Sequence, residues 1–313
     1  MSLYLHIPFC VRRCLYCDFY VLPLGKGPIS QRLQDFRSLK HRAFIKAMTE
    51  ELRALPKEYR PRTVYIGGGT PTELPPNDLR HLLHVLDTEV DLSRLEEFTC
   101  EVNPGTLDRE MAEILVAGGI DRVSLGVQSF DDPTLESLGR IHNQAEARQA
   151  FEDLRAAGMN NISLDLLFAV PNAGMDEIET NLAAIADLRP DHVSWYSLEF
   201  EPGTAFTEMR DQGFLQEADP DFTAQAYQRI RSGLRKLGYR QYELFSFTRP
   251  GYECRHNLNY WRGGPYFGCG PSAHSHQFGI RWSNPADLTT WTQSWLHSTP
   301  PPAERDILPP EGK

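Results

Sequence analysis

Two stretches of the chain repeat one another and decide the fold: Leu115-Val-Ala-Gly-Gly-Ile-Asp-Arg-Val-Ser-Leu125 and Leu154-Arg-Ala-Ala-Gly-Met-Asn-Asn-Ile-Ser-Leu164. Each is typical of the end of a helix, a glycine able to adopt the left-handed conformation of a C-cap, a short loop and a strand. A looser third copy runs from Leu188 to Trp195. This succession of helix, turn and strand predicts an α/β fold with a parallel sheet.

Six runs of β-type residues alternate with amphipathic helical segments. The predicted strands are Leu3–Ile7, Thr63–Gly67, Phe98–Val102, Arg122–Val127, Asn161–Leu167 and His192–Leu198. Polar residues follow the carboxyl ends of these strands, and in barrels those ends face one common site. We therefore expect a partial (βα)6 TIM-like barrel of the α/β class, with a doubly wound open sheet as the alternative.

Helical periodicity predicts further elements on both sides of a boundary near residue 210. Apolar spacing over Phe44–Leu52 and Leu79–Leu86 predicts two helices, the second with Asn77 or Asp78 as its N-cap. Residues 1–210 are expected to form the barrel, and residues 211–313 a small, truncated C-terminal accessory region. The elements expected in that region are a helix over Phe222–Leu237, a strand over Tyr242–Phe247 and a frayed tail over Leu308–Lys313.

Composition restricts the classes of function. The chain has 313 residues, a formal net charge of −10 and 41% hydrophobic residues. The acidic charge argues against nucleic acid as the main partner. No apolar run reaches the roughly 20 residues of a membrane span, and no secretion signal is visible, so a cytoplasmic location is expected. Peripheral contact with a membrane stays open at this point.

The spacing Cys10-x3-Cys14-x2-Cys17 is the strongest chemical signal. Three clustered thiols favour metal over a disulfide, because one pair would leave an odd reactive thiol. Structural zinc takes four protein ligands, and no fourth Cys or His lies close downstream in the motif. A 4Fe–4S cluster held by three cysteines leaves one iron open to a small molecule. The motif therefore predicts this cluster, with zinc and purely structural cysteines as alternatives.

The residues around the cysteines carry a family resemblance. Tyr4-Leu-His-Ile-Pro-Phe-Cys10-x3-Cys14-Leu-Tyr-Cys17 resembles the radical S-adenosylmethionine (SAM) superfamily, and within it the oxygen-independent coproporphyrinogen III oxidase family. Further matches follow in order over residues 1–275: Gly67-Gly-Gly-Thr-Pro-Thr72, Glu101-Val-Asn-Pro104, Gly126-Val-Gln-Ser129, Asp165-Leu-Leu and Tyr242-Glu-Leu. The resemblance implies that SAM chelates the open iron and that an electron from the reduced cluster cleaves its sulfonium bond.

The resemblance also implies the residues that contact SAM. Tyr4 and Tyr16, on either side of the cluster loop, are expected to touch the cofactor. At its methionine end, glycine would permit close backbone approach and free N–H groups would meet the carboxylate. The residues expected there are Gly68, Gly69 and Thr70, and those expected at the ribose and other polar parts are Glu101, Gln128, Arg140 and Asp165. Taken alone, the glycine triplet could equally be a plain turn, and the four polar residues surface or capping groups.

Two departures from the catalytic members of the family favour a different function. Those dehydrogenases carry another cysteine two residues after the third, where this chain has Phe19, and an extension ahead of the cluster strand. Both features resemble the heme chaperone subfamily, HemW. The leading hypothesis is therefore heme binding and transfer to an acceptor protein, with an electron donor for the cluster. The alternatives are a coproporphyrinogen III dehydrogenase, a radical enzyme that methylates or opens the heme ring, and a radical enzyme acting on RNA.

A motif near the C-terminus supplies candidate heme residues. His256-Asn-Leu-Asn-Tyr260-Trp261 resembles the heme-associated motif of that subfamily. A neutral imidazole can ligate heme iron, and the two aromatic rings offer flat faces for a porphyrin. The competing interpretation is that the aromatic residues plug the barrel mouth and His256 is a hydrogen-bonded loop histidine. Cys254 is a candidate second iron ligand, with an inert cysteine as the alternative, and His274 and His276 are candidates for facing the cofactor.

Overall fold

Six parallel strands form the centre of the structure, a computed structural model that describes residues 1–25, 31–297 and 304–307. They are β1 (Ser2–Ile7), β4 (Thr63–Gly68), β5 (Glu97–Val102), β6 (Arg122–Gln128), β7 (Ile162–Phe168) and β8 (His192–Ser197). All six predicted strands are confirmed, each within one residue at either end. They pair side by side in chain order, β1-β4-β5-β6-β7-β8. A doubly wound sheet would reverse its strand order, so the order favours the partial barrel.

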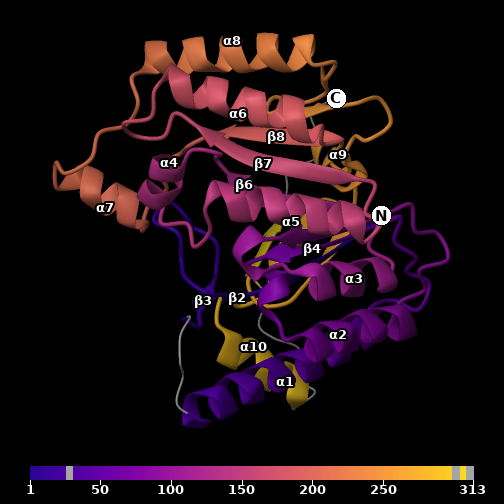
Figure 1. Ribbon diagram of the computed structural model, residues 1–313. Coiled ribbons are helices and arrows are strands. Elements are labelled where there is room, and N and C mark those ends of the chain that lie inside the picture. The colour runs from indigo at the N-terminus through magenta and orange to yellow at the C-terminus, as the bar shows by residue number, and fades with distance from the viewer. Residues whose placement is uncertain (26–30, 298–303, 308–313) are drawn as a thin grey trace.

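Helices on the outside connect these strands. They are α1 (Gln31–Arg53), α2 (Pro76–Glu89), α3 (Arg109–Ala117), α4 (Asp132–Ser137), α5 (Gln144–Ala156) and α6 (Met175–Leu188). In Figure 1, α1 lies at the bottom, α2, α3 and α5 follow above it, and α6 lies near the top. None of the helices in the described ranges is long and apolar enough to span a membrane.

The helix ends follow the local chemistry of the repeats, with one correction. In the first two copies, Gly119 and Gly158 follow the helix in the left-handed conformation, with φ +84° and +98°, as the sequence predicts. Arg189 occupies the equivalent position in the third copy, with φ +52°. The predicted N-cap of α2 is wrong. This helix begins at Pro76, whose fixed φ suits a first helical turn, so Asn77 and Asp78 already lie inside the helix.

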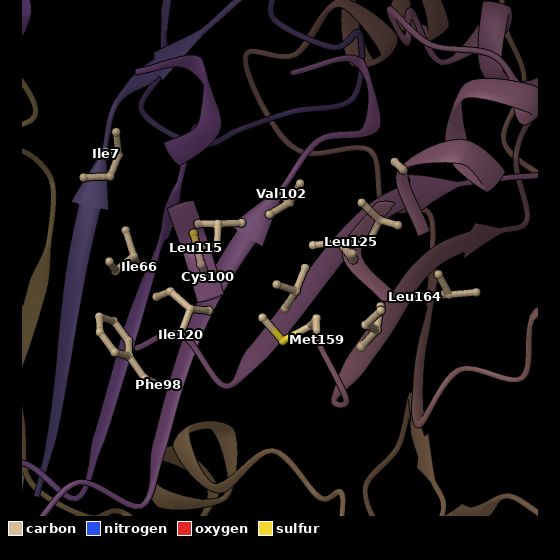
Figure 2. Packing of buried hydrophobic residues seen from close by; sticks show 14 of the residues in the cluster. Ile7, Ile66, Phe98, Cys100, Val102, Leu115, Ile120, Leu125, Met159 and Leu164 are labelled. Carbon is tan, nitrogen blue, oxygen red and sulfur yellow. The ribbon is translucent and has the colours of Figure 1, made fainter. Parts of the chain in front are cut away.

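The central strands have one apolar face and one polar face, because successive side chains point to opposite sides of a strand. Figure 2 shows the apolar face, where Ile7, Ile66, Cys100, Leu125 and Leu164 lie in the core beneath the helices. Burying one large aliphatic side chain of this kind stabilises the fold by about 1.5–3 kcal/mol. The opposite face lines the barrel interior with polar groups, among them Tyr65, Glu101, Arg122, Ser124, Asp165, Ser194 and Tyr196.

Residues after 210 extend the same sheet at both edges. β10 pairs antiparallel with β8, and β11 runs parallel to β1. The added strands are β9 (Arg240–Gln241), β10 (Ser246–Thr248), β11 (Tyr266–Cys269), β12 (His274–Gln277), β13 (Ile280–Ser283) and β14 (Glu304–Ile307). The short helix α7 (Ala205–Asp211) spans the boundary, and the helices after it are α8 (Pro220–Lys236), α9 (Arg255–Trp261) and α10 (Leu288–Leu296). The boundary near residue 210 stays a prediction, since the two regions share one sheet.

The structure confirms the predicted helix of this region and corrects its strand. The helix expected over Phe222–Leu237 is α8. The strand expected over Tyr242–Phe247 is interrupted, because Glu243 turns back to accept a hydrogen bond from the Phe245 N–H at 3.1 Å. Only Ser246–Thr248 pairs with β8. The tail over Leu308–Lys313 lies outside the described residues.

Candidate functional site

The three clustered cysteines line one cavity at the carboxyl ends of the central strands. Cys10, Cys14 and Cys17 all face this cavity, whose volume is about 440 Å³. A small two-stranded ribbon, β2 (Phe9–Cys10) with β3 (Leu22–Pro23), closes the base of the loop. The backbone of Leu15 pins the middle of the loop, donating to Leu138 O at 3.2 Å and accepting from Phe206 N at 3.0 Å. The loop is therefore held by segments that follow β6 and β8.

The surroundings of the thiols fit an iron–sulfur cluster. Cys10 Sγ lies 3.4 Å from Thr70 Oγ1, and Arg140 donates to Cys14 Sγ at 3.3 Å. Burial raises the pKa of Cys10 to about 11, so this thiol stays protonated unless a cation stabilises its thiolate. In the described ranges, no three His, Cys, Asp or Glu side chains converge on a single metal position. A multinuclear cluster fits such spaced thiols because each would bind a different iron.

The glycine loop after β4 packs directly against the cluster loop. Gly69 N donates to Ile7 O at 2.8 Å, and Thr70 N donates to Phe9 O at 2.7 Å. Gly68 N donates to the Glu101 carboxylate at 3.0 Å. The expectation that these N–H groups are free for a carboxylate is therefore wrong. The glycines serve close approach instead, since a Cβ on Gly69 would lie 2.6 Å from Phe9 O.

Glu101 lies half-buried between the glycine loop and Tyr65. Its two carboxylate oxygens accept hydrogen bonds from Tyr65 OH at 2.9 Å and from Gly68 N at 3.0 Å. Burial raises the pKa of Glu101 to about 7, and these two bonds oppose the rise. The carboxylate therefore lines the cavity in a fixed orientation.

The other predicted polar contacts come from β6, β7 and the segment after α4. Gln128 ends β6 at φ +71°, next to a break in register after Gly126. Arg140 donates to Gly126 O at 2.6 Å, and Asp165 accepts from Ser124 at 2.7 Å. Gln128, Arg140 and Asp165 line the same cavity as the cysteines, as does Tyr16.

Tyr4 lies apart from these residues. It lines a second, neighbouring hollow, where its hydroxyl donates to His6 Nδ1 at 3.1 Å. Phe19 and Glu101 border both hollows. Of the predicted SAM contacts, the structure thus gathers Tyr16, Gly68, Gly69, Thr70, Glu101, Gln128, Arg140 and Asp165 in the main cavity, and Tyr4 beside it.

Helix α9, which carries the C-terminal motif, lies across the amino ends of the central strands. Glu97, the first residue of β5, accepts from the backbone N–H groups of Arg255 at 2.8 Å and His256 at 3.0 Å. Asn257 reaches the floor of the main cavity. The motif therefore closes the barrel at the end opposite the cysteines, and not at its mouth.

Both ring nitrogens of His256 already have partners. Nδ1 lies 2.9 Å from Thr63 Oγ1, whose own proton goes to Ser2, and Nε2 lies 2.9 Å from Tyr260 OH. The histidine is 1% exposed, and burial lowers its pKa to about 3. Cys254 is buried beside Glu97, far from the cluster loop in the fold. Trp261, in contrast, is 69% exposed.

Comparison with known proteins identifies the family. The radical SAM superfamily matches residues 4–185. The heme chaperone HemW of Lactococcus lactis is 37% identical over 283 residues, covering 90% of this chain and 71% of that protein. HemW of Bacillus subtilis is 36% identical over 287 residues, covering 90% of this chain and 73% of that protein. The chain belongs to the HemW family of radical SAM proteins.

A solved structure supports the fold expected of a HemW-family chain. The coproporphyrinogen III oxidase HemN of Escherichia coli superposes with a TM-score of 0.80 at 22% identity, covering 98% of this chain and 72% of that one. At this identity the likeness concerns the fold, and it agrees with the partial barrel. Membership of the superfamily implies a 4Fe–4S cluster and SAM as cofactors, and the thiol-lined cavity has a donor set that fits the cluster.

Sequence reasoning missed several residues of the HemW-family cavity. Arg122, Tyr196 and Asn257 also line it, and Arg122 is only 2% exposed. A signal was present: polar residues alternate with apolar ones along β8 and through most of β6 and the first half of β7. A barrel interior packed for stability alone would be apolar at these positions.

Proposed function

We propose that this chain is a heme chaperone: it binds heme beside a 4Fe–4S cluster and SAM, and passes the heme to an acceptor protein. The observation that carries this proposal is its similarity to curated HemW proteins along most of its length. Phe19 supports it, because the catalytic dehydrogenases have a further cysteine at this position. Its side chain is 57% exposed at the border between the two hollows.

The three clustered cysteines are proposed to hold the cluster. Cys10, Cys14 and Cys17 would each supply one thiolate, and Arg140 would offset negative charge at Cys14. When bound, the reduced cluster supplies the electron that cleaves the SAM sulfonium bond. Cys14→Ala should therefore lose iron and the broad absorbance near ~400 nm after anaerobic reconstitution. Cys100→Ala, which changes a buried cysteine of the core, should keep both; equal loss in the two variants would contradict the ligand assignment.

The remaining residues of the main cavity are proposed to orient SAM. Glu101 and Asp165 are fixed by hydrogen bonds before any ligand arrives, so they can accept from hydroxyl groups without reorganising. Gly68 and Gly69 allow the cofactor close to the backbone, and Tyr16 and Arg140 close the side nearest the cluster loop. Tyr4 would contact ligands from the neighbouring hollow. Gln128 and Thr70 complete the proposed set.

The decisive experiment combines heme titration and product analysis in one anaerobic sample. The reconstituted chain is titrated with ferric hemin, and the difference spectra are followed. The same protein is then given coproporphyrinogen III, SAM and dithionite. Stoichiometric heme binding without porphyrinogen turnover supports the chaperone, whereas steady conversion of propionates to vinyl groups would overturn it. Transfer is measured by mixing the heme-loaded chain with an apo-hemoprotein and separating the two.

A cytoplasmic location is proposed on the chemistry of the cysteines. All six are free thiols in the structure. A reducing compartment keeps clustered thiols available to iron, whereas an oxidising one favours disulfides. The heme acceptor and the electron donor of the proposed cycle are therefore expected to be proteins that reach the cytoplasm.

A further inference from the structure

The second hollow has a volume of about 460 Å³ and lies on the β1, β11 and β12 side of the sheet. Asp18, Phe19, Gly68 and Glu101 line both this hollow and the main cavity. The residues just after Cys17 therefore separate the two spaces. Its volume lies within the roughly 300–1,000 Å³ of small-molecule sites. On the side away from the main cavity, which we call the far wall, Tyr4 is the one residue proposed above as a SAM contact.

His274, on that far wall, has the protonation pattern of an iron ligand. Its Nδ1 lies 3.1 Å from the carbonyl oxygen of Ser272, and a carbonyl can only accept a hydrogen bond. The proton of the neutral ring is therefore on Nδ1, which leaves a lone pair on Nε2. Imidazole in this form binds heme iron, and a hydrogen bond from the other nitrogen orients the ring. Ser272 holds its carbonyl in place from a left-handed conformation, φ +65°.

Two further histidines, His6 and His276, line the hollow, and they differ from His274 in their surroundings. His6 is buried, donates from Nε2 to Tyr20 O at 2.9 Å and accepts from Tyr4 OH. His276 packs its ring against Tyr266, with 6.0 Å between ring centroids. His274 is exposed. It therefore combines accessibility with a fixed tautomer.

Aromatic side chains form much of the rest of the hollow. Tyr260 and Tyr266 meet edge to face, with 4.6 Å between ring centroids, and Tyr4 and Tyr20 lie on the β1 side. Tyr260 is 37% exposed and Phe19 is 57% exposed. Flat aromatic surface of this kind packs well against a planar macrocycle.

A cation completes the rim. Arg281 on β13 lies directly opposite His276 on β12. Its charge is close enough to Tyr266 to oppose the rise in the pKa of that tyrosine, which burial causes. A guanidinium forms paired hydrogen bonds with a carboxylate, which is the group at the end of a heme propionate.

From these three groups we infer that the second hollow is the heme site, with His274 Nε2 as iron ligand, the tyrosine rings as walls and Arg281 as partner of a propionate. The inference rests on the proposed function and moves the iron ligand from the C-terminal motif to β12. His256 then becomes a positioning residue, because its Nε2 holds the Tyr260 hydroxyl at the edge of the hollow.

The test uses the anaerobic, cluster-loaded full chain and ferric hemin. His274→Gly should weaken hemin binding about 100-fold or more, since even an indirect supporting contact of a metal site is worth roughly 10–100-fold. Adding imidazole to His274→Gly should restore the Soret band. His81→Gly, which changes an exposed histidine on α2, should bind hemin as the wild type does. Circular dichroism checks that each variant is folded.

A second arm addresses the propionate. The wild-type chain should bind hemin at least 10-fold more tightly than hemin dimethyl ester, in which the propionates carry no charge. Arg281→Ala should remove most of that difference while keeping the Soret position. Equal preference in wild type and variant would overturn the assignment of Arg281.

The outcomes separate the site from the function. If the wild-type chain binds no hemin, the proposed function fails and the inference fails with it. If it binds hemin and His274→Gly keeps the wild-type spectrum and affinity, the function stands and the site assignment is overturned. Resonance Raman spectra detect the bond between iron and imidazole. If His256→Gln loses this signal while His274→Gly keeps it, the iron ligand is His256 of the C-terminal motif and not His274. For a positioning role, Tyr260→Phe should weaken binding as much as His256→Gln does.

Discussion

At the residue scale, Gly68 shows how closely the glycine loop after β4 packs against its neighbours. It has φ +104°, and a Cβ there would lie 2.4 Å from His6 Nδ1. Gly119 has a similar φ of +84°, but a Cβ there would meet nothing within 4 Å. An alanine at Gly119 would therefore suffer backbone strain alone, whereas an alanine at Gly68 would suffer both backbone strain and steric overlap.

We expect Gly119→Ala to lower the free energy of unfolding by about 1 kcal/mol, which is the cost of the left-handed conformation alone. Gly68→Ala should cost about 3 kcal/mol or more, because His6 must also move. It should in addition weaken SAM binding, which the Gly119 variant should leave unchanged. Urea denaturation and isothermal titration measure the two effects. Equal unfolding midpoints in the two variants would show that the loop has room at Gly68.

His256 gives a pH prediction with a definite sign. Its pKa falls from 6.5 to about 3 on folding, because burial disfavours the charged ring. Below pH 6.5 the His256 ring is therefore protonated in the unfolded chain but stays neutral in the folded chain. The free energy of unfolding decreases as the pH falls through this range. Between pH 7.5 and 5.5 this residue should remove about 1.4 kcal/mol from the free energy of unfolding.

The comparison is with His256→Gln, which does not titrate. The other buried histidines titrate in both proteins, so the difference between the two pH dependences isolates His256. Urea unfolding at several pH values gives these dependences. Parallel curves for wild type and variant would mean that the ring is protonated in the folded chain.

At the element scale, a buried carboxylate joins α1 to the C-terminal elements. Glu51 on α1 accepts hydrogen bonds from Gly270 N at 2.7 Å, Asn284 Nδ2 at 2.6 Å and Trp291 Nε1 at 3.0 Å. Figure 1 shows α10, which carries Trp291, lying along α1 although the two are far apart in the chain. This group holds the turn that leads into β12, and with it His274.

Glu51→Ala leaves three buried donors without their acceptor, so we expect it to destabilise the chain by about 3 kcal/mol. Hemin affinity should fall with it, because β12 loses its support. Glu50→Ala is the matched control. Its side chain is exposed and forms a surface ion pair with Arg53, so its effect should stay below about 0.5 kcal/mol. Thermal unfolding and hemin titration check both variants, and equal stability in the two would refute this role of Glu51.

The elements that could be predicted from sequence are those whose structure depends on their own residues and not on contacts with distant parts of the chain. The six central strands carry the apolar alternation in their own residues, and Gly119 and Gly158 announce the turns that precede two of them. The interruption after Tyr242 was not predictable, because it depends on Glu243 folding back onto Phe245. The start of α2 was misplaced by preferring Asn77 or Asp78 over the proline at position 76.

At the scale of the whole molecule, the C-terminal third covers both edges of the partial barrel. β11 covers the edge of β1, and β10 covers the edge of β8. A chain ending at residue 238 would expose both edges as unpaired strands, so we expect it to aggregate and to lose cooperative unfolding. A chain ending at residue 297 should still unfold cooperatively, because β14 is only the outermost strand. Light scattering and calorimetry distinguish the two, and a soluble, cooperative 1–238 chain would contradict this view.

The candidate site was partly predictable at this scale. Motif residues such as Cys10, Cys14 and Cys17 are close in sequence, so their gathering follows from one short loop. The use of the Gly69 and Thr70 N–H groups by the cluster loop could not be foreseen, because it depends on how two distant loops pack. The location of α9 at the amino ends of the strands is likewise set by its contacts with Glu97 and Thr63.

Helix α9 lies across the amino ends of the central strands, so in the part of the chain that the structure describes the main cavity opens at the carboxyl ends, where the exposed residues Arg12, Arg13 and Glu201 border it. A ligand of the main cavity would therefore enter and leave at this end, beside the residues after Cys17 that border both spaces. A flat molecule in the second hollow would lie next to this entrance. Exchange of a ligand in one space would then depend on whether the other space is filled.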